Sequence, residues 1–412
     1  MMSLTKKRWV VLAASCLINL CIGSLYAWSV FASPMAEYLS KVTESKITSL
    51  TIVFTIANVV GPITMITGGF INDKIGPKWV IFAGGLLFGT GMIMSGFSKS
   101  VGMLIVSYGL CVGLAVGMVY GCTIANSVKF FPDKRGLAGG IATASYGISS
   151  VLVPLIANVL ISHLGVTVAF KFLGAAMMLI ICIAACFITT CPKGFVPEGY
   201  LIQENLGSVT SGKNWEGMLK DPVFYVMLLM LCCGAFSGLM ITSQASPIAQ
   251  NMIRMSVTEA ATAVSVLALF NTGGRILAGY ASDKIGAINT LRAIFLIAIC
   301  GSLTLYFCKA ESTALFYIGL CIVGLSFGST MGIFPGFTAV QFGAQHNSVN
   351  YGIMFIGFAL AGFFGPTIMS KVYSNNGAYQ GAFIIAVVIA AAGFALSFVY
   401  KWAKRKKQVV EN

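Results

Sequence analysis

Arg275 is the residue whose type and surroundings point most clearly to chemistry, because its positive charge interrupts a long apolar run. The surrounding segment, residues 271–283, reads NTGGRILAGYASD. A guanidinium at the depth of a bilayer costs about 2.5–3.5 kcal/mol on insertion scales, so it needs a counter-charge. No Asp or Glu of the chain lies at a comparable depth in the sequence. We therefore predict that its partner is an anion from solution, most simply a transported one; a structural arginine bonded to helix carbonyls is the alternative.

The elements that position this arginine are expected to be membrane-spanning helices. Of the 412 residues, 57% are hydrophobic and 9% are charged, and the mean hydropathy is +0.89. Because a soluble domain carries about 25% charged residues, the composition indicates an all-α integral membrane protein. Twelve apolar runs approach the length of about 20 residues that a spanning helix needs. They are residues 9–31, 48–70, 79–96, 102–127, 137–162, 166–190, 222–244, 257–280, 289–308, 313–338, 348–370 and 378–401.

Basic residues predict how these helices are oriented. If the N-terminus lies inside, most of the 26 Lys and Arg residues fall on the inner side of a twelve-helix chain, as cytoplasmic loops require. We therefore expect a multi-pass protein of the plasma membrane with both termini in the cytoplasm. The net charge of +14 is then a topology signal, and nucleic acid is not an expected partner. The first run contains Trp28 and is followed by Pro34, with no small-residue cleavage site, so we expect a retained helix.

The chain repeats itself after about 211 residues, which predicts two halves of six helices each. The matching pairs are ASPMA at 32–36 with ASPIA at 245–249, DKIG at 73–76 with 283–286, and glycines 113, 117 and 121 with 324, 328 and 332. Halves of the same orientation indicate a pseudo-twofold axis along the membrane normal. We predict an N-terminal bundle at 1–190, a cytoplasmic linker at 191–221 and a C-terminal bundle at 222–412.

The repeated glycines recur at every fourth position and therefore share one face of each helix. Small residues on such a face let two helices approach closely. Two interpretations stay open at this point: static packing, and smooth faces that let helices close and reopen.

The loop at residues 69–78, GFINDKIGPK, resembles the signature of the major facilitator superfamily, Gly-x-x-x-Asp-Lys/Arg-x-Gly-x-Lys/Arg. Its physical logic is a tight glycine turn with an aspartate near a helix N-terminus and near cations. The resemblance implies a twelve-helix fold in which this loop and its copy latch the cytoplasmic helix ends in an outward-facing state. The residues that it assigns to this gating role are Gly69, Asp73, Lys74, Asp283 and Lys284, with Asp133 and Arg135 of the segment FFPDKRG.

Further segments are similar to one branch of that superfamily, the oxalate:formate antiporters with the related bacterial lactate and pyruvate carriers. They are residues 23–31, 120–121, 130–138, 271–275 and 350–354, so the resemblance runs through both halves. It implies that Arg275 binds the anion in a central cavity and that Asn271, one turn earlier, shares its face. The other residues implied to line this cavity are Leu25, Tyr26, Tyr120 and Tyr146 from the first half, and Phe327, Met331 and Phe355 from the second.

Phe358 departs from the pattern of that branch, in which oxalate carriers place a lysine at this position. A second carboxylate facing an aromatic ring in low dielectric would be expensive. A monocarboxylate needs one guanidinium for its head, and an apolar wall suits its other end. Phe358 therefore favours lactate, pyruvate, formate or acetate over oxalate, although Phe355 and Phe358 could equally be packing residues.

The coupling of transport is left open by the sequence. Glu259, at the outer end of its span, is one candidate for proton coupling, and a proton carried on the substrate as the neutral acid is another. Symport, exchange and uniport therefore all remain. Lys171 near the outer end of the sixth span is expected to snorkel to the surface, with a secondary anion-attracting role as the alternative.

Enzymatic chemistry, a metal site and a cofactor are not expected. The twelve cysteines are scattered through apolar runs, and the only histidines are His163 and His346. Neither metal-ligand spacing nor a Walker loop is present. The sequence thus predicts a secondary transporter that moves a small monocarboxylate by alternating access. An oxalate:formate-type exchanger is the first alternative; a transporter-like sensor would need a longer soluble domain.

Overall fold

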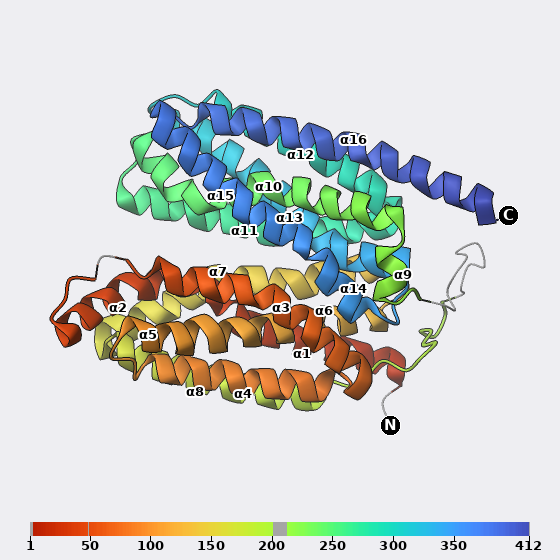
Figure 1. The fold of residues 1–412 in the computed structure, drawn as a ribbon, viewed down its shortest axis with the longest axis horizontal. Helices are drawn as coiled ribbons and strands as arrows, with labels where there is room; N and C mark the ends of the chain where they lie inside the picture. The colour runs from red at the N-terminus through yellow and green to blue at the C-terminus, as the bar shows by residue number, and fades with distance from the viewer. Residues whose placement is uncertain (1–2, 48, 201–211, 412) are drawn as a thin grey trace. The chain divides into compact units, whose positions relative to one another are not determined.

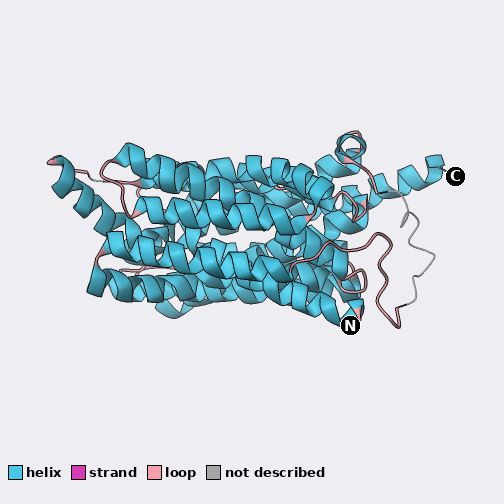
Figure 2. Cartoon of the chain, turned by 90° about the horizontal axis from the view of Figure 1, so that it is seen from below, coloured by secondary structure: helices cyan, strands magenta, loops and turns pink. Residues whose placement is uncertain are grey.

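The computed structural model describes residues 3–47, 49–200 and 212–411, and every regular element within these ranges is a helix (Figure 2). Twelve of its helical segments are long and apolar enough to cross a membrane. In the first half they consist of α1 (Leu4–Ile22), η1 (Gly23–Ala27) and α2 (Trp28–Thr43), α3 (Thr51–Ile75), α4 (Pro77–Ser95), α5 (Val101–Leu104), η2 (Ile105–Val112) and α6 (Gly113–Phe130), α7 (Arg135–Leu164) and α8 (Val166–Phe187).

The second half of the chain also forms six membrane-spanning segments, built from α10 to α16 (Figure 1). It contains the short α9 (Trp215–Leu219), then α10 (Pro222–Asn251), α11 (Val257–Ile285), α12 (Ala287–Tyr306), α13 (Thr313–Phe342), α14 (Asn347–Met354) with α15 (Ile356–Asn376), and α16 (Gln380–Glu411). The twelve predicted spans are therefore confirmed. Three helices, α10, α11 and α13, are longer than the apolar runs that predicted them. Each continues through polar residues at its C-terminal end.

Two spans contain a segment of 3₁₀- or π-helix, and the eleventh is interrupted at Phe355 between α14 and α15; the apolar pattern predicted none of this. The first span passes through the 3₁₀ segment η1 at Gly23, where a Cβ would lie 2.5 Å from the carbonyl oxygen of Tyr146. The fourth contains the π-helical segment η2, in which the Ser107 hydroxyl donates to the Met103 carbonyl oxygen at 2.9 Å. A close backbone approach and a side-chain hydrogen bond thus accompany the 3₁₀ and π-helical segments.

The chain forms two compact units, each with its own buried core. Unit 1 comprises Met1–Asp133, Ser145–Val209 and Ala344–Gly352, and unit 2 comprises Lys134–Ala144, Thr210–Gly343 and Ile353–Asn412. The first residues of α7 therefore pack in unit 2, and the start of α14 packs in unit 1. The simple division at residues 191–221 remains a prediction.

The repeated glycines bring one pair of helices together in each unit. In unit 1 a Cβ at Gly117 on α6 would lie 1.8 Å from the Gly61 carbonyl oxygen on α3. In unit 2 a Cβ at Gly328 on α13 would lie 1.8 Å from the Asn271 carbonyl oxygen on α11. Both pairs of backbones touch at positions where no side chain fits. This contact fixes α11, the helix that carries Arg275.

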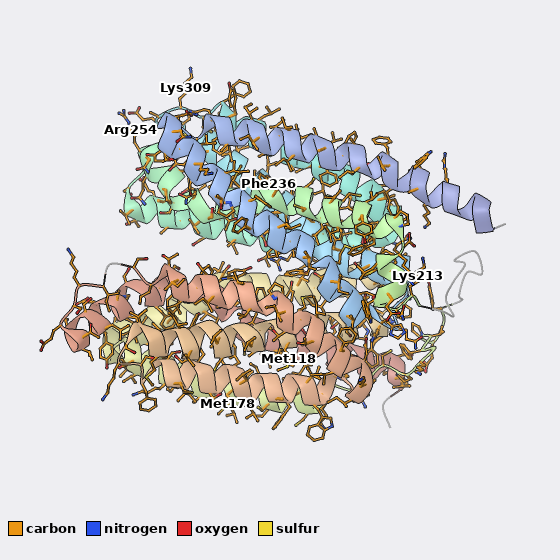
Figure 3. The ribbon with its side chains drawn as sticks, viewed as in Figure 1. Met118, Met178, Lys213, Phe236, Arg254 and Lys309 are labelled. Atoms are coloured by element: carbon orange, nitrogen blue, oxygen red, sulfur yellow. The ribbon has the colours of Figure 1, made fainter. Side chains whose placement is uncertain are left out.

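The two ends of unit 2 carry different basic residues. Figure 3 shows Arg254 and Lys309 at one end of its helices and Lys213 at the other. The backbone N–H of Lys213 donates to the Phe342 carbonyl oxygen at 2.8 Å, and its side chain forms an ion pair with Asp221.

Candidate functional site

Arg275 lies buried on α11, with 5% of its surface exposed. Its Nε donates to the Asn271 side-chain oxygen at 3.0 Å, and its Nη1 donates to the main-chain oxygen of Thr143 on α7 at 2.7 Å. The Asn271 side chain can accept this hydrogen bond because residues four apart lie on the same face of a helix. Nη2 donates no hydrogen bond to any described residue. The guanidinium is therefore held on two sides and keeps one terminal nitrogen for another acceptor.

The charge of Arg275 has no acidic partner within the described parts of the chain. Arg275 is in none of the ion pairs of the described residues, which include Arg8 with Asp133, Lys41 with Glu37, Lys129 with Asp73 and Lys213 with Asp221. Main-chain and amide oxygens satisfy hydrogen bonds but do not neutralise a cation. A buried cation without a counter-charge is expensive, so this position favours a bound anion.

The backbone at Arg275 is fixed from two neighbouring helices. A Cβ at Gly332 on α13 would lie 2.3 Å from the Arg275 carbonyl oxygen, and a Cβ at Gly140 on α7 would lie 2.4 Å from it. The Ser329 hydroxyl also donates to the Gly274 carbonyl oxygen at 3.2 Å. The guanidinium thus projects from a tightly held segment.

Aromatic side chains of unit 2 form a stack on α13 and the start of α15. The rings of Phe327 and Phe358 are 6.5 Å apart between centroids and 8° from parallel; those of Phe355 and Phe358 are 4.5 Å apart and 25° from parallel. Phe327 and Met331 are buried. Each directly precedes a glycine, Gly328 or Gly332, that packs on the backbone of Asn271 or Arg275. These predicted residues therefore lie on the helix that adjoins Arg275.

The predicted residues of unit 1 form a cluster of their own. Tyr146 is its centre, with its ring 5.3 Å from that of Tyr26 and 4.8 Å from that of Tyr120. Leu25, in η1, is buried at 3% exposure. The structure brings the three tyrosines together; their placement in one cavity with Arg275 remains a prediction.

The residues of unit 1 that were predicted to act in gating make contacts with other segments. Asp73 pairs with Lys129 at 3.2 Å, while Lys74 is exposed. A Cβ at Gly69 would lie 2.9 Å from the backbone of Ser348, so α3 touches the start of α14 there. Asp133 accepts from Arg8 at 2.6 and 3.2 Å.

The copy of the loop in unit 2 caps a helix. Both carboxylate oxygens of Asp283 accept backbone N–H groups at the start of α7, from Gly136 and Leu137, each at 2.8 Å. An anion at a helix N-terminus satisfies free N–H groups and interacts well with the helix dipole. Arg135 donates to the Ala339 carbonyl oxygen at 3.4 Å, and Lys284 is exposed with Nζ 5.8 Å from the Tyr280 ring.

Two contacts of these groups escaped the sequence analysis. Arg8 was counted only among the basic residues that set the topology, because it directly follows Lys6 and Lys7 at the start of the first span. The Thr143 carbonyl had no signal at all, because any residue type carries one.

Glu259 and Lys171 each have a local partner. Glu259 is exposed and closes a capping box at the start of α11, where its carboxylate accepts from the backbone N–H and the hydroxyl of Ser256, both at 2.8 Å. The Lys171 Nζ lies 3.8 Å from the centre of the Phe97 ring, a cation–π contact. Neither contact decides whether the residue takes part in transport.

Two cavities lie away from these residues. One of about 270 Å³ lies in unit 1 beside Trp28 and Phe54, and one of about 110 Å³ lies in unit 2 beside Tyr373 and Tyr379. Neither is lined by a predicted site residue. The described residues also contain no group of three His, Cys, Asp or Glu side chains placed to hold a metal ion.

A family model described as Major Facilitator Superfamily matches residues 15–366, which is most of the chain. The chain belongs to the major facilitator superfamily. This assignment confirms the resemblance carried by the loop at residues 69–78, and members of this family are transporters rather than enzymes.

Curated relatives of this major facilitator protein match along most of their length. It is 29% identical over 392 residues to the oxalate:formate antiporter of Oxalobacter formigenes, covering 95% of this chain and 90% of the relative. It is 28% identical over 362 residues to the uncharacterized MFS-type transporter YhjX of Escherichia coli (strain K12), covering 86% of each chain. Human monocarboxylate transporter 12 is 22% identical, covering 95% of this chain and 78% of the relative.

Solved major facilitator structures share the fold. FucP in the outward conformation matches with a TM-score of 0.72 at 14% identity, covering 96% of this chain and 99% of that one. The proton:xylose symporter XylE matches with a TM-score of 0.73 at 14% identity, covering 97% of both chains. The chain is therefore a multi-pass membrane transporter with the twelve-helix fold of this superfamily.

Proposed function

We propose that this transporter moves a small monocarboxylate by alternating access and that Arg275 binds the carboxylate. The observation that carries the proposal is a buried guanidinium with no acidic partner among the described residues and one terminal nitrogen without an acceptor. A carboxylate matches the paired N–H groups of arginine in geometry and charge. Its arrival would neutralise the cation and lower the cost of enclosing it.

The names of the relatives support an organic anion as the substrate class. One is an oxalate:formate antiporter and another a monocarboxylate transporter. These names belong to those proteins, and at 22–29% identity the substrate of this chain is inferred from its own residues. In this inference Arg275 binds the carboxylate of the substrate, and the stacked rings of Phe327, Phe355 and Phe358 contact its apolar end.

Phe358 supports a monocarboxylate over a dicarboxylate. Its ring stacks on Phe355 and lies parallel to Phe327, where the resemblance implies a lysine in oxalate carriers. A second carboxylate beside these rings would lose its hydration without gaining a hydrogen-bond donor. The methyl or hydroxyalkyl end of lactate, pyruvate or acetate would suit the same surface, and formate is small enough to need no second group.

We also propose the setting in which this transport takes place. The distribution of basic residues supports both termini in the cytoplasm and a location in the plasma membrane. A proton carried on the substrate accounts for symport more simply than Glu259, because that carboxylate already closes the capping box of α11. The tyrosine cluster around Tyr146 and the loop residues around Asp73 and Asp283 keep their proposed binding and gating roles.

Uptake into proteoliposomes tests the proposal directly. Labelled formate, acetate, lactate, pyruvate and oxalate would be offered to wild type and to Arg275→Gln, with Arg254→Gln, an exposed arginine of unit 2, as the matched control. We expect uptake of at least one monocarboxylate, its loss in Arg275→Gln and its retention in Arg254→Gln. Monocarboxylate uptake by Arg275→Gln at the wild-type rate and KM would refute the role of Arg275.

An oxalate:formate-type exchanger is the second candidate, favoured by the 29% identical relative of that name. Preloading the vesicles with unlabelled oxalate or formate separates the two. Strong stimulation of uptake by internal oxalate would favour the exchanger, and uptake into empty vesicles would favour the monocarboxylate carrier.

A further inference from the structure

A second arginine within a spanning segment of unit 2 also lacks an acidic partner. Arg292 is the sixth residue of α12, and its Nε donates to the Ser397 hydroxyl of α16 at 2.9 Å. Its Nη2 donates to the Ser397 carbonyl oxygen at 3.4 Å, and its guanidinium lies 4.1 Å from the centre of the Phe398 ring. Nη1 donates to no described residue. The Arg292 side chain is thus held at the contact of α12 with α16, and its Nη1 has no hydrogen-bond acceptor among the described residues.

Further cations of α16 follow Ser397, and one of them reaches α12. Lys401, one turn after Ser397, donates from Nζ to the Asn289 side-chain oxygen of α12 at 3.4 Å. Lys404 and Arg405 follow on the next turn and are exposed. We call Arg292, Lys401, Lys404 and Arg405 the α12–α16 basic cluster.

Within the part of the chain whose side chains the structure describes, no acidic group pairs with this cluster. Residues 287–306 and 380–405 contain neither Asp nor Glu. Nearby in unit 2, Asp283 accepts from the start of α7, and Asp221 pairs with Lys213. None of the four cations makes an ion pair with a described residue. Two of these cations lie at the contact of α12 with α16 and two follow on the exposed part of α16; without a described counter-charge they favour an external anion.

The surroundings of the cluster indicate which anion. Leu296, Phe398 and Trp402 are 49%, 52% and 62% exposed, and they belong to helices that are long and apolar enough to span a membrane. Such side chains face lipid, and tryptophan is typical of the headgroup level. The cluster therefore lies where apolar chains give way to headgroups, so its anion is expected to have an apolar tail.

This cluster is more than the usual excess of basic loop residues. The corresponding helices of unit 1 are α4 and α8. α4 carries Lys78 next to Trp79 at its start, and α8 has no basic residue after Lys171. A general topology signal would act on both repeats alike. Lys193 corresponds to Lys404 at the repeat offset of 211, whereas the counterparts of Lys401 and Arg405 are Thr190 and Gly194. Arg292, Lys401 and Arg405 are therefore the cations specific to the second repeat.

We propose that the α12–α16 basic cluster binds the phosphodiester head group of an anionic phospholipid. Arg292 and Lys401 hold the phosphate with charge-assisted hydrogen bonds, while Lys404 and Arg405 add longer-range attraction. The acyl chains run along Leu296 and Phe398. This binding concerns a different face from Arg275 and does not depend on the substrate that the protein carries.

Native mass spectrometry of the purified full-length transporter tests the assignment. The probes are phosphatidylglycerol and phosphatidylcholine with identical chains, offered at equal concentration, with inorganic phosphate as a third arm. The variants are Arg292→Gln/Lys401→Gln, the exposed pair Lys404→Gln/Arg405→Gln, whose folding should be unaffected, and Lys74→Gln/Lys78→Gln of unit 1 as the charge-matched control.

We expect wild type to retain phosphatidylglycerol in preference to phosphatidylcholine. The first variant should lose roughly tenfold or more of that affinity and the second a smaller part, because each basic residue near an anionic lipid contributes separately. The control should bind as wild type does. Equal retention of the two lipids, equal losses in the control, or displacement of phosphatidylglycerol by inorganic phosphate would overturn the proposal.

Discussion

The side chain of Arg275 on α11 donates from Nη1 to the main-chain oxygen of Thr143 on α7 at 2.7 Å. A carboxylate that binds an arginine through two parallel hydrogen bonds uses either both terminal nitrogens or Nε with one of them. Because Nε is held by Asn271, an anion on Arg275 would bind through Nη2 and the second N–H of Nη1. The hydrogen bond to Thr143 and the anion can therefore share the guanidinium, and binding is expected to leave the link between α11 and α7 in place.

Replacing Asn271 by Asp should abolish transport without unfolding the protein. The new carboxylate would lie 3.0 Å from the Arg275 Nε, at the position of the present amide oxygen, and would supply the missing counter-charge from within. A substrate anion would then meet a neutral pair. We expect uptake to fall by at least roughly tenfold, the effect of about 1.4 kcal/mol, with Asn271→Ala less affected.

Uptake of the preferred monocarboxylate, measured beside thermal unfolding of each variant, checks this prediction. A fully active Asn271→Asp variant would mean that Arg275 does not need to be an unpaired cation.

Replacing Phe358 by Lys should admit a dicarboxylate. A second cation beside Phe355 and Phe327 would pair with the second carboxylate of oxalate, a charge-assisted interaction of about 1.5–3 kcal/mol. The inhibition constant of oxalate against monocarboxylate uptake should fall by roughly tenfold or more. Phe358→Leu keeps the site apolar and should leave oxalate inhibition unchanged; equal behaviour of the two variants would remove Phe358 from the specificity argument.

Gly328 should tolerate no larger residue. A Cβ there would lie 1.8 Å from the Asn271 carbonyl oxygen, so Gly328→Ala must push α13 away from α11. Overpacking of this kind costs about 1–3 kcal/mol and should lower the Tm and the uptake rate together.

Gly273 on α11 is the matched control, because a Cβ there meets nothing within 4 Å. Gly273→Ala should keep or slightly raise the Tm, since alanine favours helix by about 1 kcal/mol over glycine. Equal losses of Tm in the two variants would show that the close approach is not what makes Gly328 necessary.

Cys191 should react slowly with thiol reagents at neutral pH. Burial raises the pKa of its thiol to about 11, against the opposing effect of Lys129, and the thiol donates to the Lys129 carbonyl oxygen. Since only the thiolate reacts, the labelling rate should rise with pH up to the region of pH 11. A variant that retains Cys191 alone would be compared with a cysteine-free protein carrying Glu198→Cys, an exposed position of the same segment. Equal rates at pH 7 would contradict the prediction.

The spans of the fold were predictable, because apolar runs of bilayer length carry a strong signal. Their ends were less so: α11 continues to Ile285 through Ser282 and Asp283, where its apolar run has stopped. The 3₁₀ segment η1 depends on a contact between Gly23 and Tyr146, which are far apart in the chain. No local pattern encodes such a contact.

The candidate site was predictable where it depends on helical spacing. Asn271 and Arg275 share a face by their separation of four, and the structure shows their hydrogen bond. The Thr143 carbonyl, the capping of α7 by Asp283 and the phenylalanine stack arise from tertiary packing. Sequence indicates which side chains are unusual; packing decides which neighbours they meet.

The glycine contacts set the two repeats in correspondence residue by residue. Gly121 packs on Met65 in one repeat, as Gly332 packs on Arg275 in the other, and Gly61 takes the place of Asn271. The two repeats therefore share this scaffold, but only the second carries a polar pair in it. Met65, the counterpart of Arg275, offers an apolar position in the same framework at which the effect of introducing a charge can be measured.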